Sequence, residues 1–220
     1  MPASQLTTLF NTNPYYDDYS EDNGFLKALF KPGVAIQARE LTQLQSFLQV
    51  QLERISSNIF ENGSIVAGGG VADFRSNYIR IEDPLTDSEL SSLIGVKIYS
   101  GDVVGRVIQF IKPTAAQVGT DDDHQILIYS SETAGAFASG VSVGTTGPDH
   151  PGITVIPNAT GTDAISVTVD DGIYYVNGYF VKAAKQTITP YAVDSDNIRV
   201  FKSPSAAVGF RAKNEIITDQ

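Results

Sequence analysis

The sequence predicts an α+β protein that is mainly β, in which one long N-terminal amphipathic helix precedes short-stranded antiparallel β-sandwich or barrel modules. Three observations lead to this fold class. One segment near the N-terminus has helical periodicity, and most of the remaining chain consists of short runs rich in β-branched and aromatic residues. Glycine, proline and aspartate separate these runs, as turn residues do between short strands.

The long helix is expected from Ile36 to Phe60. Its apolar residues recur in steps of three and four, which places them on one face, while glutamine and glutamate dominate the opposite surface. We call this face the leucine stripe: Leu41, Leu44, Leu48, Leu52, Ile55 and Ile59. The mean step of about 3.6 residues favours a nearly straight helix bundle over a supercoiled heptad seam. Periodicity alone leaves open whether the stripe packs on copies of this chain or on its own β-domain.

The β part begins after Gly63. A short helix is expected at Asp87–Leu93 with Asp87 or Ser88 as its cap, and short strands follow from Val96 onward. Residues 145–163 contain several prolines and glycines and are interpreted as a connector. Residues 164–182 are expected to form a three-stranded meander, with one turn at Asp170-Asp171-Gly172 and another at Asn177-Gly178.

The domain organisation follows from these elements. Residues 1–33 are expected to be an extended lead-in, and residues 34–62 the long helix that mediates oligomerisation. Residues 63–98 and 161–202 are assigned to a β-domain, 99–160 to an inserted small β-module with a linker, and 203–220 to the start of a further region.

Composition restricts the function classes. The chain has 220 residues, a formal net charge of −10 and no cysteine. An acidic chain lacks the clustered Lys and Arg that phosphate backbones require, so no nucleic-acid partner is expected. Disulfides, thiolate metal sites and thiol nucleophiles are excluded. No apolar run approaches the ~20 residues of a membrane span, so no membrane partner is expected.

No catalytic or metal-binding constellation is evident. His124 follows three aspartates and His150 follows Asp149, but both segments have the composition of exposed loops. The sequence contains neither a nucleophile elbow nor a phosphate-binding loop nor a zinc-protease motif. We therefore expect a protein that is not an enzyme, with no cofactor, no metal and no small-molecule substrate.

An acidic, tyrosine-rich segment precedes the helix. We call it the tyrosine patch, and it is a candidate docking surface for another protein. Its residues are Tyr15, Tyr16, Asp17, Asp18 and Tyr19.

Several of these segments resemble a family of tailed-bacteriophage virion structural proteins, which are large baseplate or tail-fibre proteins with an N-terminal domain of unassigned function. The similarity is carried by PYYDDY at 14–19, by LFKPGVAIQARELTQLQ at 29–45, by IFENGS at 59–64 and by GIYYVNGYFV at 172–181. Residues 99–160 resemble the family only in their general composition, without a specific matching block. Family members usually extend well beyond residue 220, so the resemblance implies an N-terminal portion of a longer protein.

The resemblance implies a structural component of a phage tail, either baseplate or tail fibre, that is made in the bacterial host cytoplasm and resides in the virion. This chain would be its attachment and oligomerisation region, with copies of itself, expected as a homotrimer, and other tail or baseplate proteins as partners. One alternative is a carbohydrate-binding or degrading module of a fibre, with Tyr15, Tyr16, Tyr174, Tyr175 and Tyr179 stacking on sugars. Another is a monomeric adaptor that docks a second virion protein.

Overall fold

The computed structural model describes residues 16–146, 154–202 and 204–213. The chain divides into two compact units, and each is described by itself. The helical unit comprises residues up to Gly69 together with Asp171–Ala184. The sheet unit comprises Gly70–Asp170 together with the chain from Lys185 onward.

Helix α1 of the helical unit spans Ala38–Ser56, so the expectation of a long helix from Ile36 to Phe60 is wrong. The helix begins after Gln37, whose backbone N–H donates to Glu40 Oε2 at 3.2 Å. It ends because polar side chains compete for its last carbonyls. Ser57 Oγ and Asn58 Nδ2 both donate to the carbonyl of Arg54. The apolar periodicity continues to Ile59, which lies in the turn that follows the helix.

A three-stranded sheet completes the helical unit, in the order β1 (Ile65–Gly68), β8 (Gly172–Val176) and β9 (Tyr179–Ala183). The turn between β8 and β9 is Asn177-Gly178, as predicted, and both residues have positive φ. The other predicted turn, at Asp170-Asp171-Gly172, does not form a hairpin. Strand β8 pairs with β1, whereas the preceding strand belongs to a different sheet.

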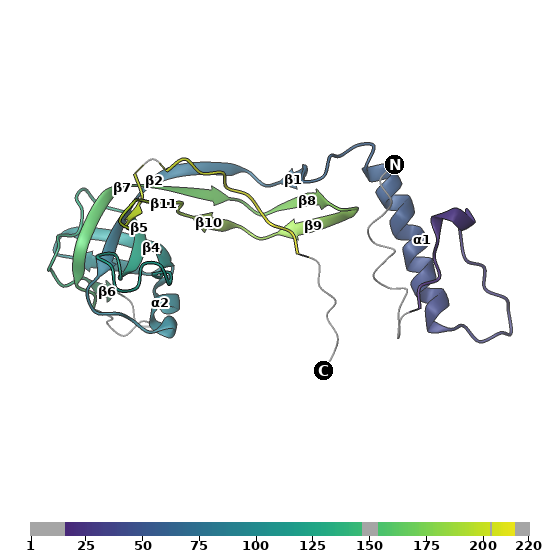
Figure 1. Ribbon diagram of the computed structural model, residues 1–220, viewed down its shortest axis with the longest axis horizontal. Helices are drawn as coiled ribbons and strands as arrows, with labels where there is room; N and C mark the ends of the chain where they lie inside the picture. The colour runs from purple at the N-terminus through teal and green to yellow at the C-terminus, as the bar shows by residue number, and fades with distance from the viewer. Residues whose placement is uncertain (1–15, 147–153, 203, 214–220) are drawn as a thin grey trace. The chain divides into compact units, whose positions relative to one another are not determined.

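The sheet unit is built on a seven-stranded antiparallel sheet with the order β10-β7-β2-β5-β4-β3-β6 (Figure 1). A two-stranded pair, β11 with β12, lies nearer the C-terminus. Together these elements make the protein mainly β. In chain order the strands are β2 (Val71–Ile81), β3 (Lys97–Ser100), β4 (Val103–Ile111), β5 (Gln125–Ser131), β6 (Gly144–Thr146), β7 (Pro157–Val169), β10 (Gln186–Ile188), β11 (Ala192–Val193) and β12 (Arg199–Val200).

One large sheet replaces the predicted short-stranded sandwich or barrel modules, so this part of the fold class is also wrong. Strand β7 has 13 residues and continues through Gly161, which lies opposite Tyr78 of β2. A Cβ at Gly161 would lie 2.3 Å from the Tyr78 ring, and one at Gly105 of β4 would lie 2.4 Å from the Tyr129 ring. These glycines make room for tyrosine rings on the neighbouring strand instead of ending strands.

The expected connector at 145–163 lies partly outside the described residues, since 147–153 are not described. Its last seven residues, 157–163, belong to β7. The short helix was predicted correctly, because α2 spans Asp87–Leu93. Its cap is Thr86, however, whose Oγ1 accepts from the Glu89 backbone N–H at 3.3 Å.

The sheet is buried on both faces at its centre. Ile126 and Ile128 of β5 pack on one side with Phe201, while Leu127 and Tyr129 pack on the other with Leu90 and Leu93 of α2. Strand β5 therefore has a continuous run of buried residues, as a strand covered on both faces does. Helix α2 contributes to one core and the C-terminal segment to the other.

A buried ionic cluster holds the C-terminal segment in the sheet unit. Asp122 is fully buried; its Oδ1 accepts from Arg80 Nε at 2.8 Å, and its Oδ2 accepts from Arg199 Nε at 2.7 Å. Arg199 Nη2 also donates to the carbonyls of Asp122 and His124. Burial alone would raise the pKa of Asp122, but the hydrogen bonds from Arg199 and Arg80 outweigh it and hold that pKa below its ordinary value.

Replacing Asp122 by Ala is expected to lower the free energy of unfolding of the sheet unit by about 3–5 kcal/mol, because the buried guanidinium of Arg199 and the partly buried one of Arg80 lose their counter-charge. Chemical denaturation followed by circular dichroism measures this loss. The control is Asp163→Ala, since Asp163 forms an exposed pair with Lys202 at 3.9 Å and such pairs contribute about 0–1 kcal/mol. Equal effects of the two substitutions would contradict this account of the cluster.

The same cluster predicts a pH dependence. Because the pKa of folded Asp122 is depressed, its stabilisation is complete above the ordinary value of 3.8 and is lost as the pH falls through the folded-state pKa. The free energy of unfolding of the wild-type chain should therefore fall as the pH drops below 3.8. Asp122→Asn should remove this part of the acid dependence.

Candidate interaction site

Helix α1 presents three faces, which differ in what covers them. At about 100° per residue, Phe47 lies roughly 100° to one side of the centre of the leucine stripe and Gln49 roughly 100° to the other. The face with Phe47 and the face with Gln49 are both covered by other parts of the helical unit. The leucine stripe lies between them.

The first face packs against the N-terminal segment. Phe47 and Val50 are buried with Tyr19, and Ala28 packs against this cluster. The rings of Tyr19 and Phe47 meet edge to face, with centroids 5.1 Å apart and an interplanar angle of 88°. Burial raises the pKa of the Tyr19 hydroxyl. The N-terminal segment that contains Tyr19, drawn in purple beside α1 in Figure 1, is therefore anchored by apolar contact.

Polar contacts add to this anchor. The buried carboxylate of Asp17 accepts a hydrogen bond from the Tyr19 backbone N–H at 3.1 Å and another from the Ser46 hydroxyl of α1. Asp18 pairs with Arg39 at 3.6 Å, and Glu21 pairs with Arg54 at 3.4 Å. These two ion pairs are exposed, so each contributes little compared with the buried contacts.

The second face receives the β8–β9 hairpin. Gln49 Nε2 donates to the carbonyl of Gly178 at 2.6 Å, at the tip of that hairpin. Burial, followed by the nearby negative charge of Glu53, raises the pKa of Tyr175 and Tyr179. After the helix, Phe60 contacts Tyr175 and Phe180, with ring centroids 6.1 and 5.9 Å away.

The third face, the leucine stripe, is uncovered. Leu41, Leu48, Leu52 and Ile55 are 49%, 65%, 43% and 62% exposed, and Leu44 is half-buried. Ile59 is exposed in the turn after α1. Large apolar side chains aligned on one face and left in water are a feature of association surfaces. The structure thus brings five of the six predicted interface residues together on one helix face.

The tyrosine patch is divided by the fold. Asp17 and Tyr19 are buried against α1, whereas Tyr16 and Asp18 are exposed and Tyr15 lies outside the described residues. Asp17 and Tyr19 therefore anchor the segment, and a partner could reach only Tyr16 and Asp18 among the described members. Sequence reasoning missed Phe47 and Val50 as the receiving face. Their spacing of three residues on the side opposite the stripe was the available signal.

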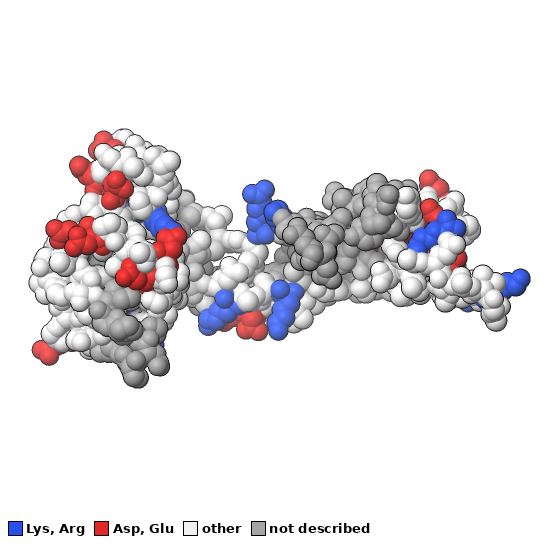
Figure 2. Space-filling model, turned by 90° about the horizontal axis from the view of Figure 1, so that it is seen from below, with Lys and Arg blue, Asp and Glu red and all other residues white. Residues whose placement is uncertain are grey.

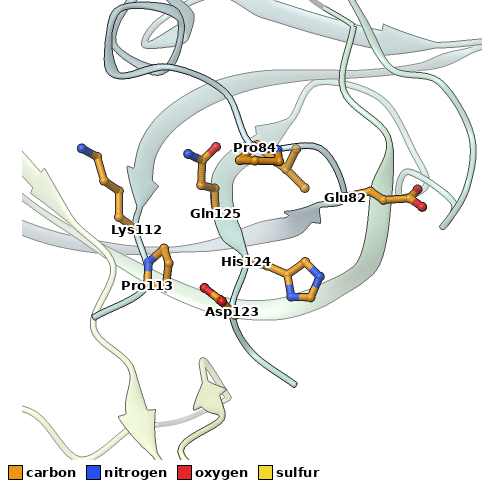
Figure 3. A pocket seen from close by; sticks show the side chains of 8 residues that line it. Glu82, Pro84, Lys112, Pro113, Asp123, His124 and Gln125 are labelled. Carbon is orange, nitrogen blue, oxygen red and sulfur yellow. The ribbon is translucent and has the colours of Figure 1, made fainter. Parts of the chain in front are cut away.

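A pocket of about 350 Å³ in the sheet unit is lined by Ile81, Glu82, Pro84, Lys112, Pro113, Asp123, His124 and Gln125 (Figure 3). Two of its polar side chains already have partners. Lys112 pairs with Asp87, and Gln125 bonds both backbone groups of Leu85. The side chains of Asp123 and His124 leave the chain in opposite directions in Figure 3, so they form no acid–base pair.

His124 instead contacts Asn158, with 2.8 Å between His124 Nε2 and Asn158 Nδ2. Its Nδ1 is buried and has no partner among the described residues. His150 lies outside the described residues. Within the described ranges, no group of three or more His, Asp or Glu side chains is placed to hold a metal ion.

Charge is unevenly spread over the surface. Figure 2 shows several separate groups of acidic side chains on a mostly uncharged surface. Among the described helices, none has the length and apolar character needed to cross a membrane.

The fold and the site define a mainly β protein with an uncovered apolar helix face. A family model described as "Domain of unknown function (DUF4815)" matches residues 13–83. The matched region contains the anchored N-terminal segment, α1, β1 and β2. No match was found to the curated proteins or to the solved structures.

The anchor can be tested by replacing Phe47 with Ala. Truncating a fully buried Phe costs about 3–5 kcal/mol, so the N-terminal segment should detach from α1. Hydrogen exchange of the hydrogen-bonded amides of Tyr19, Asn23 and Gly24 should accelerate at least ~10-fold. Gln45→Ala, at an exposed position of α1, is the matched control. Unchanged exchange in the Phe47 variant would show that the cluster does not hold the segment.

Proposed function

We propose that the helical unit is an assembly module through which copies of this chain associate along the leucine stripe. The chain is, on this proposal, a non-enzymatic structural component of a phage tail, either baseplate or tail fibre, and this part is its attachment and oligomerisation region. The single observation that carries the assembly role is the uncovered stripe on α1, whose two flanking faces are occupied.

The small core of the helical unit supports this reading. Its main buried apolar cluster among the described residues consists of Tyr19, Phe47 and Val50. Many other large apolar side chains of the unit are exposed to water. Burying a Leu or Ile side chain contributes about 1.5–3 kcal/mol. Association along the stripe would therefore supply stabilisation that the isolated unit lacks.

The geometry of the stripe is compatible with a bundle of copies around a common axis. The five stripe residues within α1 follow each other in steps of three, four, four and three, so they stay on one side of a straight helix. We propose three copies, the number that the family resemblance suggests. The flanking contacts with the N-terminal segment and the hairpin would then lie outside the bundle.

The phage assignment rests on the resemblance of the sequence blocks at 14–19, 29–45, 59–64 and 172–181. The matching family description names no function, so it neither adds to nor removes from this assignment. The proposed partners are copies of this chain and other tail or baseplate proteins, in the virion after synthesis in the bacterial host cytoplasm.

The stripe is tested by the double variant Leu48→Lys, Leu52→Lys. Both side chains are exposed in the single chain, so the helical content should remain unchanged, while buried charges should weaken association at least ~100-fold. Light scattering should give about three times the chain mass of 23.6 kDa for the wild type and one chain mass for the variant. Ser57→Lys, at an exposed position just after α1, should leave association unchanged.

A wild-type chain that remains monomeric at high concentration would refute the assembly role and favour the monomeric adaptor. An oligomer that survives the double variant would place the contact elsewhere.

A further inference from the structure

The segment between the N-terminal anchor and α1 is a second uncovered apolar surface. We call residues 25–36 the arm. All of its residues except Ala28 are exposed, and none belongs to a helix or strand. Six large apolar side chains extend into water: Phe25, Leu26, Leu29, Phe30, Val34 and Ile36. So many exposed apolar groups on a short connecting segment indicate a contact that the single chain does not contain.

The arm is badly placed to cover the leucine stripe of its own chain. Ala28 packs with Tyr19, Phe47 and Val50, on a face of α1 that lies roughly 100–160° from the stripe. The end of the arm is fixed by the hydrogen bond between Gln37 and Glu40 at the start of α1. The exposed side chains of the arm and those of the stripe therefore remain separate surfaces.

The charged residues of the arm suggest what the arm contacts. The arm carries Lys27 and Lys31 and no acidic residue, and neither lysine forms an ion pair with any described residue. The preceding turn is strongly acidic, with Asp18, Glu21 and Asp22 exposed, and Asp22 has no basic partner among the described residues. Because Lys27, Lys31 and Asp22 form no ion pair among the described residues, the arm of one copy and the Asp22 turn of another copy are complementary in charge.

The number of residues that a stable interface needs also points to a second copy of this chain as the partner. A helix of 19 residues is about 28 Å long, and only about half of its residues can face a bundle axis. Stable protein interfaces use roughly 20–30 residues from each partner. The stripe alone falls short of this number, and the arm would supply the missing residues.

We propose that the arm of each copy packs against the helical unit of the neighbouring copy, with Lys27 and Lys31 facing that copy's Asp22 turn. In a cyclic oligomer each arm then contacts the next copy, and the ring of contacts closes. This inference rests on the proposed assembly function, because it requires neighbouring copies.

Cross-linking tests the contact directly, because the chain contains no native cysteine. One chain carries Leu29→Cys and a second chain carries Asp22→Cys, so a link between the two positions can form only between chains. After mixing and reassembly, a short bis-maleimide should yield a dimer containing one chain of each kind. The control replaces the second chain by one with Asp163→Cys, an exposed position of the sheet unit, and should yield at least ~10-fold less product.

A charge exchange tests the pairing. The double variant Lys27→Glu, Lys31→Glu should weaken association at least ~10-fold, and adding Asp22→Lys should restore it in part. Each of these residues is exposed, and none forms an ion pair with the described residues, so the fold of the single chain should be preserved.

The outcomes separate the two proposals. The wild type could be oligomeric and dissociate in the Leu48→Lys, Leu52→Lys variant, yet give no cross-link and no effect of the arm variants. That result would overturn the arm contact and leave the proposed assembly function standing. Cross-linking with charge rescue would establish the arm contact. A monomeric wild type would overturn both.

Discussion

The sheet unit depends on the antiparallel pairing of β2 with β7. Its register runs from Val71 opposite Val169 to Ile81 opposite Pro157, so it joins the two ends of a long intervening stretch of chain. The strands that lie between them in the chain, β3 to β6, extend the sheet beyond β2, where β5 is the neighbour, and the later strand β10 pairs with the other edge of β7. Such non-local pairing costs loop-closure entropy before contacts compensate it, so the sheet must form as one cooperative structure.

The two units differ in how much of their apolar surface is buried within the single chain. The sheet unit has two apolar cores and a buried ionic cluster, and its β5 is covered on both faces. Among its described residues, the helical unit has a small buried cluster around Phe47 and the aromatic contacts of Phe60, while its leucine stripe and arm are exposed. This contrast is the physical basis for proposing that the helical unit mediates assembly.

Some features were accessible to sequence reasoning because their causes are local. The Asn177-Gly178 turn follows from the ease with which both residues adopt positive φ. The position of α2 was predicted correctly, although its cap is Thr86 and not Asp87 or Ser88. The members of the leucine stripe follow from helical periodicity. The tyrosine patch shows the limit of such reasoning, since Asp17 and Tyr19 were chosen for accessible chemistry and are buried by α1.

By itself, the sequence determined the helical period of α1, the alternation and turn residues of several strands, and the absence of cysteine chemistry. Only the tertiary structure decided which strands share a sheet and which face of α1 stays uncovered. The reason is that periodicity is a property of neighbouring residues, whereas these outcomes depend on partners far along the chain. Gly161 illustrates this, because it resembles a turn residue until Tyr78 of a distant strand is seen to occupy the space beside it.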